Sequence, residues 1–326
     1  MKYVNLGTTG MKVSPFCLGT MQFGWTADEK ASFEVMNRAW DAGINFFDTA
    51  DIYTRWSDKS YSGKTEEIIG RWLKDTGNRE DLILATKLRG QFTTKPNDSG
   101  LSKRHMMRQI KGSLNRLQTK WIDLYQSHSF DDQVPIKETL EGFSNLVSKG
   151  LVNAIGASNY PAWRLVEALH IAEKYNLPSY KSLQPYYSIA RRHRFEPDLQ
   201  EVCLQHNIAV IPYSPLSGGF LTGKYRRDQE LPESDRANGV KTRFFNDRGF
   251  SILERVEELA KEKEVTIAQL SLAWNLHQPS ITSPIIGANS VEQLDELLPA
   301  LDIQLNQEEL KRLDEVSNPE TNYIIQ

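Results

Sequence analysis

The feature that most constrains this chain is a regular alternation of short apolar segments with longer amphipathic ones. Eight short segments have the length and apolar character of buried strands: 16–18, 44–48, 82–87, 122–126, 154–157, 182–184, 208–213 and 284–286. Helical patterns accompany them at 29–41, 65–75, 103–117, 135–149, 162–175, 196–205 and 291–298. Strands alternating with helices predict βαβ units in a parallel sheet. Eight units without a break favour an α/β fold of the closed (β/α)8 TIM-barrel type over an open sheet.

Further segments lie outside this repeat. Residues 2–13 predict a β-hairpin, because two short alternating stretches flank the turn Gly7-Thr8-Thr9-Gly10. Extra segments follow the seventh and eighth strands: a polar loop at 224–248, helices at 251–263, 267–277 and 306–317, and a tail at 318–326. No Gly/Ser linker or low-complexity tract divides the chain. We therefore expect one domain that covers residues 1–326.

Residues at several helix ends support these boundaries. Thr26 and Glu29 have the spacing of a capping box at the start of the 29–41 helix. Gly43 stands where a glycine often terminates a helix. Ser102 directly precedes a basic helical segment, which predicts a side-chain cap for its first turn.

The overall composition excludes several classes of protein. A formal net charge of −3 gives no attraction to nucleic acid or anionic membrane. The N-terminus lacks the apolar core of a signal peptide, and no apolar run approaches the roughly 18 residues of a membrane span. Cys17 and Cys203 stand far apart, which indicates neither a disulfide framework nor a metal site. We expect a cytoplasmic protein without metal, membrane or nucleic-acid partners; the oligomeric state is left open.

Four polar side chains stand at or just after the ends of three consecutive predicted strands. Asp48 closes one apolar run and Tyr53 follows it; Lys87 and His128 close the next two. Taken singly, each has a plainer explanation, such as a solvated lysine or a structural histidine. Asp51, between Asp48 and Tyr53, is assigned to turn chemistry. In a barrel, however, the carboxyl ends of all strands meet at one rim, so we expect the four to converge.

This combination suits proton transfer to a carbonyl oxygen. Reduction of an aldehyde or ketone leaves an alkoxide that needs a nearby acid, and Tyr53 is the candidate. A close ammonium from Lys87 is expected to bring the pKa of Tyr53 down. Asp48 would keep Lys87 charged and oriented, and His128 would hydrogen-bond the carbonyl oxygen.

The hydride source must bind outside a Rossmann motif. Gly19-Thr20-Met21-Gln22-Phe23-Gly24 after the first strand does not match G-x-G-x-x-G. Gly287-Ala288-Asn289-Ser290 opens a helix after the last strand and is a better seat for a phosphate. Ser217-Gly218-Gly219 with Lys224 is expected to line the pyrophosphate path, and Tyr213 to lie against a nicotinamide ring.

Several motifs carry a resemblance over nearly the whole chain: 45–53, 85–87, 126–128, 156–159, 184–187, 212–216 and 284–287. Together they resemble the aldo-keto reductases, in particular a bacterial branch related to potassium-channel β-subunit-like reductases. The resemblance implies an NADP(H) cofactor, a small carbonyl substrate, and Asp48, Tyr53, Lys87 and His128 as the catalytic tetrad. The cofactor-binding residues that it implies are Thr20, Met21, Ser158, Asn159, Gln184, Tyr213, Ser214, Leu216, Ser217, Gly219, Lys224, Arg236, Gly287, Asn289, Gln293 and Glu296.

Two departures bear on the choice of NADP over NAD. Many family members have a lysine where Gly287 stands, and the branch often has an adenine-binding asparagine where Leu297 stands. Gln293 and Glu296 keep the pattern. The pocket walls are expected to include Trp25 and Trp56, which suits an apolar or aromatic carbonyl.

Two alternative functions stay open. One is an NADP-binding sensor or regulatory protein with little turnover, similar to the channel β subunits; these carry asparagine at the position of His128, so the histidine favours an enzyme. The other is a barrel lyase or epimerase that uses Lys87 and Tyr53 for enolisation.

Overall fold

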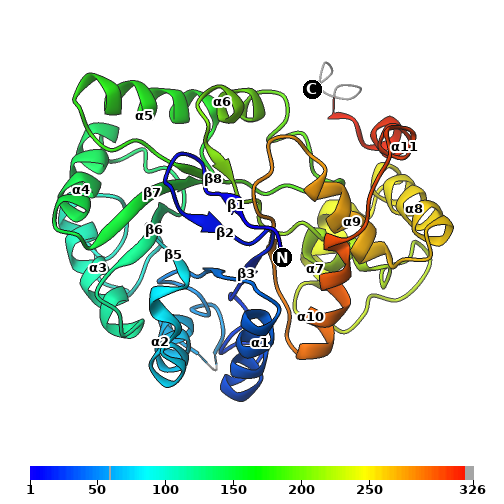
Figure 1. Ribbon diagram of the computed structural model, residues 1–326, viewed down its shortest axis with the longest axis horizontal. Helices are drawn as coiled ribbons and strands as arrows, with labels where there is room; N and C mark the ends of the chain where they lie inside the picture. Colours follow the sequence, from blue (N-terminus) through cyan, green and yellow to red (C-terminus); the bar gives the residue numbers. More distant parts are fainter. Residues whose placement is uncertain (59, 320–326) are drawn as a thin grey trace.

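A ring of eight parallel strands forms the centre of the computed structural model, which describes residues 1–58 and 60–319 (Figure 1). The strands are β3 (Cys17–Gly19), β4 (Phe46–Asp48), β5 (Ile83–Leu88), β6 (Ile122–Ser127), β7 (Val152–Ser158), β8 (Ser182–Gln184), β9 (Ala209–Val210) and β10 (Ile285–Ile286). The sheet order is β10-β3-β4-β5-β6-β7-β8-β9. The two outermost strands of this order, β10 and β9, meet where the amide of Ile285 donates to the carbonyl of Pro212 at 2.8 Å. The predicted (β/α)8 barrel is confirmed.

Helices surround this ring in chain order. Those that follow β3 to β8 are α1 (Glu29–Asp41), α2 (Lys64–Thr76), α3 (Lys103–Arg116), α4 (Ile136–Ser148), α5 (Ala162–Lys174) and α6 (Leu199–Gln205). The added helices are α7 (Ala237–Phe244), α8 (Asp247–Glu262), α9 (Ile267–Leu276), α10 (Val291–Leu297) and α11 (Gln307–Ser317). Short 3-10 turns occupy η1 (Asn78–Glu80), η2 (Ser217–Thr222) and η3 (Leu298–Leu301). Among the described helices, none combines the length and apolar character needed to cross a membrane.

The predicted hairpin is present as β1 (Val4–Asn5) paired antiparallel with β2 (Lys12–Val13). It lies across the near end of the ring in Figure 1. Leu6 and Val13 pack there against Cys17 and Phe46, inside the barrel. The hairpin therefore closes the end of the barrel at which the strands begin and leaves the carboxyl ends for a site.

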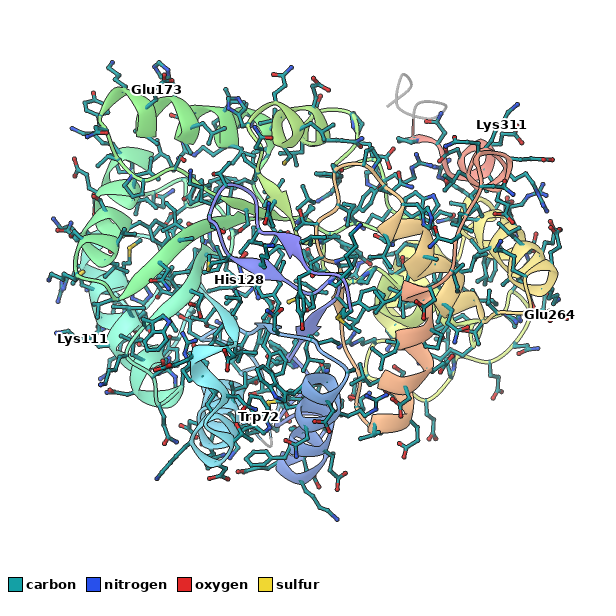
Figure 2. The ribbon with its side chains drawn as sticks, viewed as in Figure 1. Trp72, Lys111, His128, Glu173, Glu264 and Lys311 are labelled. Carbon is teal, nitrogen blue, oxygen red and sulfur yellow. The ribbon has the colours of Figure 1, made fainter. Side chains whose placement is uncertain are left out.

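Two apolar cores follow from the two-residue alternation of strand side chains. Phe46 belongs to the core inside the barrel, whereas Phe47 belongs to the core between strands and helices. Trp72 of α2 packs on Phe47 with ring centroids 5.4 Å apart, and Figure 2 labels it among the outer helices. The residue after Phe47 faces inward again, and that residue is Asp48.

Some boundaries differ from the predictions. The loop predicted at 224–248 contains α7, and α6 begins at Leu199 because the preceding residues form turns. The tail predicted at 318–326 lies outside the described residues from 320 onward. The caps predicted at Ser102 and Gly43 are confirmed: Ser102 Oγ accepts from the His105 amide, and Gly43 follows α1 with φ of +88°.

The capping box predicted for Thr26 and Glu29 is wrong. Asp28, which directly precedes the helix, caps α1 by accepting a hydrogen bond from the amide of Ala31 at 2.9 Å. The Thr26 hydroxyl instead donates to Asn289 Oδ1 at 2.7 Å. It thereby joins the loop after β3 to the loop after β10.

Candidate active site

Strand alternation brings polar side chains to the carboxyl end of the barrel. Ala85 and Leu124 face the inner core, so Lys87 and Gln126, two residues further along, face inward as well. Lys87 and Gln126 are register partners on β5 and β6, and Gln126 pairs in turn with Gly156 on β7. A Cβ on Gly156 would lie 3.0 Å from the Cγ of Gln126. Glycine at this position therefore leaves room for the inward side chains.

The Lys87 ammonium is the centre of this group, with no exposed surface. It donates three hydrogen bonds: to Asp48 Oδ2 at 2.5 Å, to the Tyr53 phenol oxygen at 2.7 Å and to the carbonyl of Thr49 at 2.9 Å. Burial opposes the charge, but Asp48 and Tyr53 together raise the pKa of Lys87 above its ordinary value. Lys87 is therefore a fully bonded cation at neutral pH.

Tyr53 accepts from Lys87, which has no acceptor to offer in return. The phenol proton is thus left for a ligand in the barrel mouth. The expected lowering of the Tyr53 pKa is not found: burial raises the pKa from 10.0 to about 12, against the opposing charge of Lys87. Burial is the largest influence, and the charge of Asp48 also raises the pKa of Tyr53.

Asp48 is held by two amides besides Lys87. Gln126 Nε2 donates to its Oδ1 at 3.0 Å, and Gln184 Nε2 donates to the same oxygen at 2.9 Å. Gln126 was not predicted, although it stands two residues before His128 on an inward position. Gln184 was assigned only to the cofactor, and the structure adds a contact with Asp48.

His128 follows β6 and lines the mouth of the barrel; Figure 2 labels it toward the middle of the ring. Its ring centroid lies 6.0 Å from that of Tyr53. Burial, helped by the charges of Lys87 and Arg89, lowers the pKa of His128 from 6.5 to about 3. The imidazole is therefore neutral at physiological pH and offers one N–H donor.

These groups open into a cavity of about 740 Å³. Its walls contain most of the predicted residues: Thr20, Met21, Trp25, Asp48, Tyr53, His128, Ser158, Asn159, Gln184, Tyr213, Ser214, Leu216, Gly219, Lys224, Arg236, Gly287, Asn289, Gln293 and Glu296. Three predicted residues are not in the wall. Lys87 lies buried behind Tyr53, and Ser217 is turned away, with its hydroxyl 2.7 Å from that of Ser188. Trp56 stands outside the wall, with 44% of its surface exposed.

The cavity is also lined by residues that were not predicted. Gln22 lines it and donates to the carbonyls of Gly19 at 3.0 Å and Ala288 at 2.9 Å, which joins the first and last strands. Glu233 and Asp235 come from the loop that also carries Arg236. The sequence of the long loop at 224–248 contains no pattern that would have selected these two residues.

Tyr213, Asn159 and Ser158 form a connected polar wall on β7 to β9. The Tyr213 hydroxyl donates to Asn159 Oδ1 at 2.9 Å, and Asn159 Nδ2 donates to the carbonyl of His128 at 3.0 Å. Ser158 Oγ donates to the carbonyl of Gln184 at 2.9 Å. The Tyr213 ring packs against the Tyr186 ring, with centroids 5.2 Å apart, and also lines the cavity, which suits an aromatic ring bound there.

Two cations, Lys224 and Arg236, line the cavity. Burial, and then the charge of Arg236, lower the pKa of Lys224 below its ordinary value. Arg236 also has a pKa lowered by burial, and its guanidinium lies 5.9 Å from the Trp25 ring. Two cations that repel each other are stabilised by a bound anion, so these two side chains are suited to an anionic ligand.

The predicted phosphate seat after β10 is partly occupied by the protein itself. The Asn289 amide donates to Gln293 Oε1 at 2.9 Å, and Ser290 Oγ accepts from the Gln293 amide at 3.4 Å. A Cβ on Gly287 would lie 3.2 Å from the amide of Gln22. The absence of a side chain at Gly287 therefore keeps this stretch open beside Gln22.

Aromatic rings line the outer side of Tyr53. Trp56 makes edge contacts with Tyr53 at 6.3 Å and with Trp25 at 5.4 Å. Trp25 lines the cavity, and Trp56 forms its rim rather than its wall.

Asp51 does more than form a turn. It has no exposed surface, and neither carboxyl oxygen has a hydrogen-bond partner in the described chain. Burial, and then the charge of Glu66, raise the pKa of Asp51 well above its ordinary value. Asp51 lies in the turn at 51–56, in keeping with the expectation, but its burial, and not the turn, is what raises its pKa.

The chain is similar to known proteins over nearly its whole length. The model of the aldo/keto reductase family matches residues 15–318. The chain is 39% identical to the uncharacterized oxidoreductase YrpG of Bacillus subtilis, over 97% of this chain and 96% of that protein. It is 34% identical to a putative voltage-gated potassium channel subunit beta of Schizosaccharomyces pombe, over 96% and 92% of the two chains. It is 32% identical to a versiconal hemiacetal acetate reductase of Aspergillus parasiticus, over 97% and 96%. This chain belongs to the aldo/keto reductase family.

Proposed function

We propose that this oxidoreductase reduces aldehydes or ketones to alcohols with NADPH, and that Tyr53 is the proton donor. The observation that carries the proposal is the Lys87 ammonium, which bridges Asp48 and Tyr53 beneath a cavity lined by His128. A phenol that accepts from an ammonium and keeps its own proton is arranged to give that proton away.

The cavity fits a nicotinamide dinucleotide along its length. Ser158, Asn159 and Gln184 would hold the carboxamide, and Tyr213 would cover the ring. Lys224 and Arg236 would hold the phosphates, with Gly287 to Gln293 along the adenosine end. NADPH, when bound, supplies the hydride that adds to the carbonyl carbon.

Tyr53 and Lys87 handle the proton. As negative charge develops on the carbonyl oxygen, the O–H bond of Tyr53 breaks and a new O–H bond forms on the substrate. An alkoxide is a stronger base than a phenolate whose parent phenol has a pKa of about 12, so the transfer is downhill. Lys87, 2.7 Å from the phenol oxygen, stabilises the phenolate until water returns the proton.

His128 and the aromatic rim would position the substrate. A neutral imidazole can donate one N–H to the carbonyl oxygen without competing as an acid with Tyr53. Trp25 lines the cavity beside this point and Trp56 stands at its rim, which favours an apolar or aromatic carbonyl as the partner molecule.

The direct test is oxidation of NADPH by a panel of aldehydes and ketones, followed by loss of nicotinamide absorbance. Wild-type protein is expected to turn over at least one carbonyl, and Tyr53→Phe to lose about a hundredfold or more in kcat. NADPH binding without turnover of any carbonyl would instead favour an NADP-binding sensor or regulatory protein. Conversion of a carbonyl compound without NADPH consumption would favour a lyase or an epimerase.

A further inference from the structure

Three arginines near the mouth of the barrel have no role in the reaction described above. Arg191 and Arg194 belong to the loop between β8 and α6, and Arg243 belongs to α7. Within the part of the chain that the structure describes, no salt bridge involves any of them, whereas the neighbouring Arg192 is paired with Glu196 at 2.7 Å. These three residues are called the arginine cluster below. Their positive charge has no direct carboxylate partner among the described residues.

Two ring contacts place Arg191 close to the cavity. Its guanidinium lies 4.3 Å from the ring centre of Tyr186, and the Tyr186 ring lies 5.2 Å from that of Tyr213. Tyr213 lines the cavity, whereas Arg191 does not. The two contacts together span less than about 10 Å, which is the Debye length at 0.1 M salt. The charge of Arg191 therefore acts on an ion at the cavity, although its side chain is not part of the wall.

Helix α7 brings Arg243 to the same side of the mouth. A Cβ on Gly218, which lines the cavity, would lie only 3.3 Å from Val240 Cγ2, so α7 packs directly behind the wall. Arg243 follows three residues later, and its Nη1 donates to the Gly239 carbonyl at 3.2 Å. Burial raises the pKa of Tyr213, and the charges of all three arginines of the cluster act against this rise. The cluster therefore surrounds this tyrosine.

The wall of the cavity is itself poor in positive charge. Apart from Asp48, which is paired with Lys87, its charged residues are two cations and three acids: Lys224, Arg236, Glu233, Asp235 and Glu296. NADPH carries about four negative charges, about two on the pyrophosphate and about two on the 2′-phosphate. A wall with more acids than cations does not attract such a ligand from a distance. The arginine cluster reverses this balance and makes the mouth of the barrel positive.

We propose that the arginine cluster attracts the dinucleotide to the cavity and speeds its binding, without contacting it in the complex. The inference rests on the proposed function, because it takes NADPH as the ligand. Charges of one sign around a cleft raise the association rate of an oppositely charged ligand by about tenfold or more. Because the attraction acts at a distance, it raises kon and leaves koff to the residues of the wall. The cluster also favours NADPH over NADH, since the 2′-phosphate adds about two charges.

The test is stopped-flow binding of NADPH, followed by quenching of tryptophan fluorescence, since Trp25 lines the cavity. The double variant Arg194→Gln/Arg243→Gln removes two exposed charges of the cluster and keeps the contact of Arg191 with Tyr186. At about 50 mM salt we expect its kon to fall about tenfold, with koff within about twofold of wild type. At about 500 mM salt the two proteins should have nearly the same kon, because the Debye length is then only about 4 Å.

The matched control removes the same amount of charge elsewhere. Arg104→Gln/Lys111→Gln changes two exposed cations of α3, which Figure 1 shows on the opposite side of the ring from α7. This variant should keep the wild-type kon at both salt concentrations. Arg194→Lys/Arg243→Lys should also keep most of it, because attraction at a distance needs the charge and not a bidentate contact. The ratio of kon for NADPH to kon for NADH should fall in Arg194→Gln/Arg243→Gln alone.

Contrary results would overturn the inference in distinct ways. A higher koff with an unchanged kon would make the cluster part of the binding site itself. An equal fall of kon in the α3 control would assign the effect to the net charge of the protein. An unchanged kon in Arg194→Gln/Arg243→Gln, in a protein that still oxidises NADPH with a carbonyl, would refute the cluster and keep the proposed function. Absence of NADPH binding by wild-type protein would refute the proposed function itself.

Discussion

Lys87 Nζ lies 2.7 Å from the phenol oxygen of Tyr53, and both side chains are almost completely buried. All three protons of the ammonium are used, by Asp48, Tyr53 and the Thr49 carbonyl. The contact leaves the Tyr53 proton as the one donor of this group that faces the cavity.

Replacement of Lys87 by methionine should impair reduction far more than cofactor binding. The change leaves Tyr53 without its cation and Asp48 as a buried acid without its main partner. We expect kcat to fall about a hundredfold or more. The Kd for NADPH should stay within about tenfold, or ~1.4 kcal/mol. Lys111→Met, on the exposed face of α3, is the matched control. Equal losses in kcat and NADPH affinity would mean that Lys87 has a different role.

The pH dependence of the reaction should be set by Tyr53 and not by His128. Reduction needs a protonated Tyr53, and a pKa raised to about 12 keeps it protonated through pH 9. With a pKa lowered to about 3, His128 stays neutral above pH 5. We therefore expect kcat for reduction to be flat from pH 5 to 9, and alcohol oxidation to rise with pH. An inflection near pH 6.5 in the kcat of reduction would contradict the state assigned to His128.

Gln126 and Gln184 make the same contact with Asp48 and should be separable by cofactor binding. Replacing either by leucine removes one hydrogen bond to a buried carboxylate and should lower the free energy of unfolding by about 1–3 kcal/mol. Only Gln184→Leu should also raise the Kd for NADPH, because Gln126 does not line the cavity. Fluorescence titration with NADPH and denaturant unfolding of both variants give the comparison. An unchanged Kd in Gln184→Leu would restrict its role to Asp48.

Asp51 should make the protein less stable as the pH rises. Its pKa is raised in the folded state, so folding takes up a proton at any pH between the unfolded and folded pKa values. Asp51→Asn removes this cost. Its stability relative to wild type should grow from pH 4 to pH 7, by up to about 1.4 kcal/mol per pH unit. Asp75→Asn, an exposed site on α2, should show no such trend. Parallel stability curves for wild type and Asp51→Asn would show that Asp51 is ionised in the folded protein.

Arg236 should be important for cofactor affinity. Arg236→Gln removes one of the two cations, Lys224 and Arg236, that line the cavity, and it should raise the Kd for NADPH about tenfold or more, which is ~1.4 kcal/mol. Titration with NADH tells which phosphate it contacts. A similar rise for both cofactors would place Arg236 at the pyrophosphate, and a rise for NADPH alone would place it at the 2′-phosphate. No change with either would remove it from the cofactor site.

The sequence by itself determined the barrel and its strand-end residues. Eight apolar segments that alternate with amphipathic ones predict a closed barrel of parallel strands. In such a barrel the carboxyl ends of all strands meet at one rim. Asp48, Tyr53 and His128 could be selected in this way because each stands at or near the abrupt end of an apolar run. Lys87 also stands at the end of an apolar segment and could be selected in the same way. In the structure it lies behind Tyr53.

Only the tertiary structure decided which side chains touch and which charges are paired. Gln126 was overlooked and the burial of Asp51 was not foreseen, because their surroundings come from β4, β8 and α2, which only the folded chain brings together. The pKa of Tyr53 moved opposite to the expectation, since burial is a property of the packed barrel and outweighs one neighbouring charge.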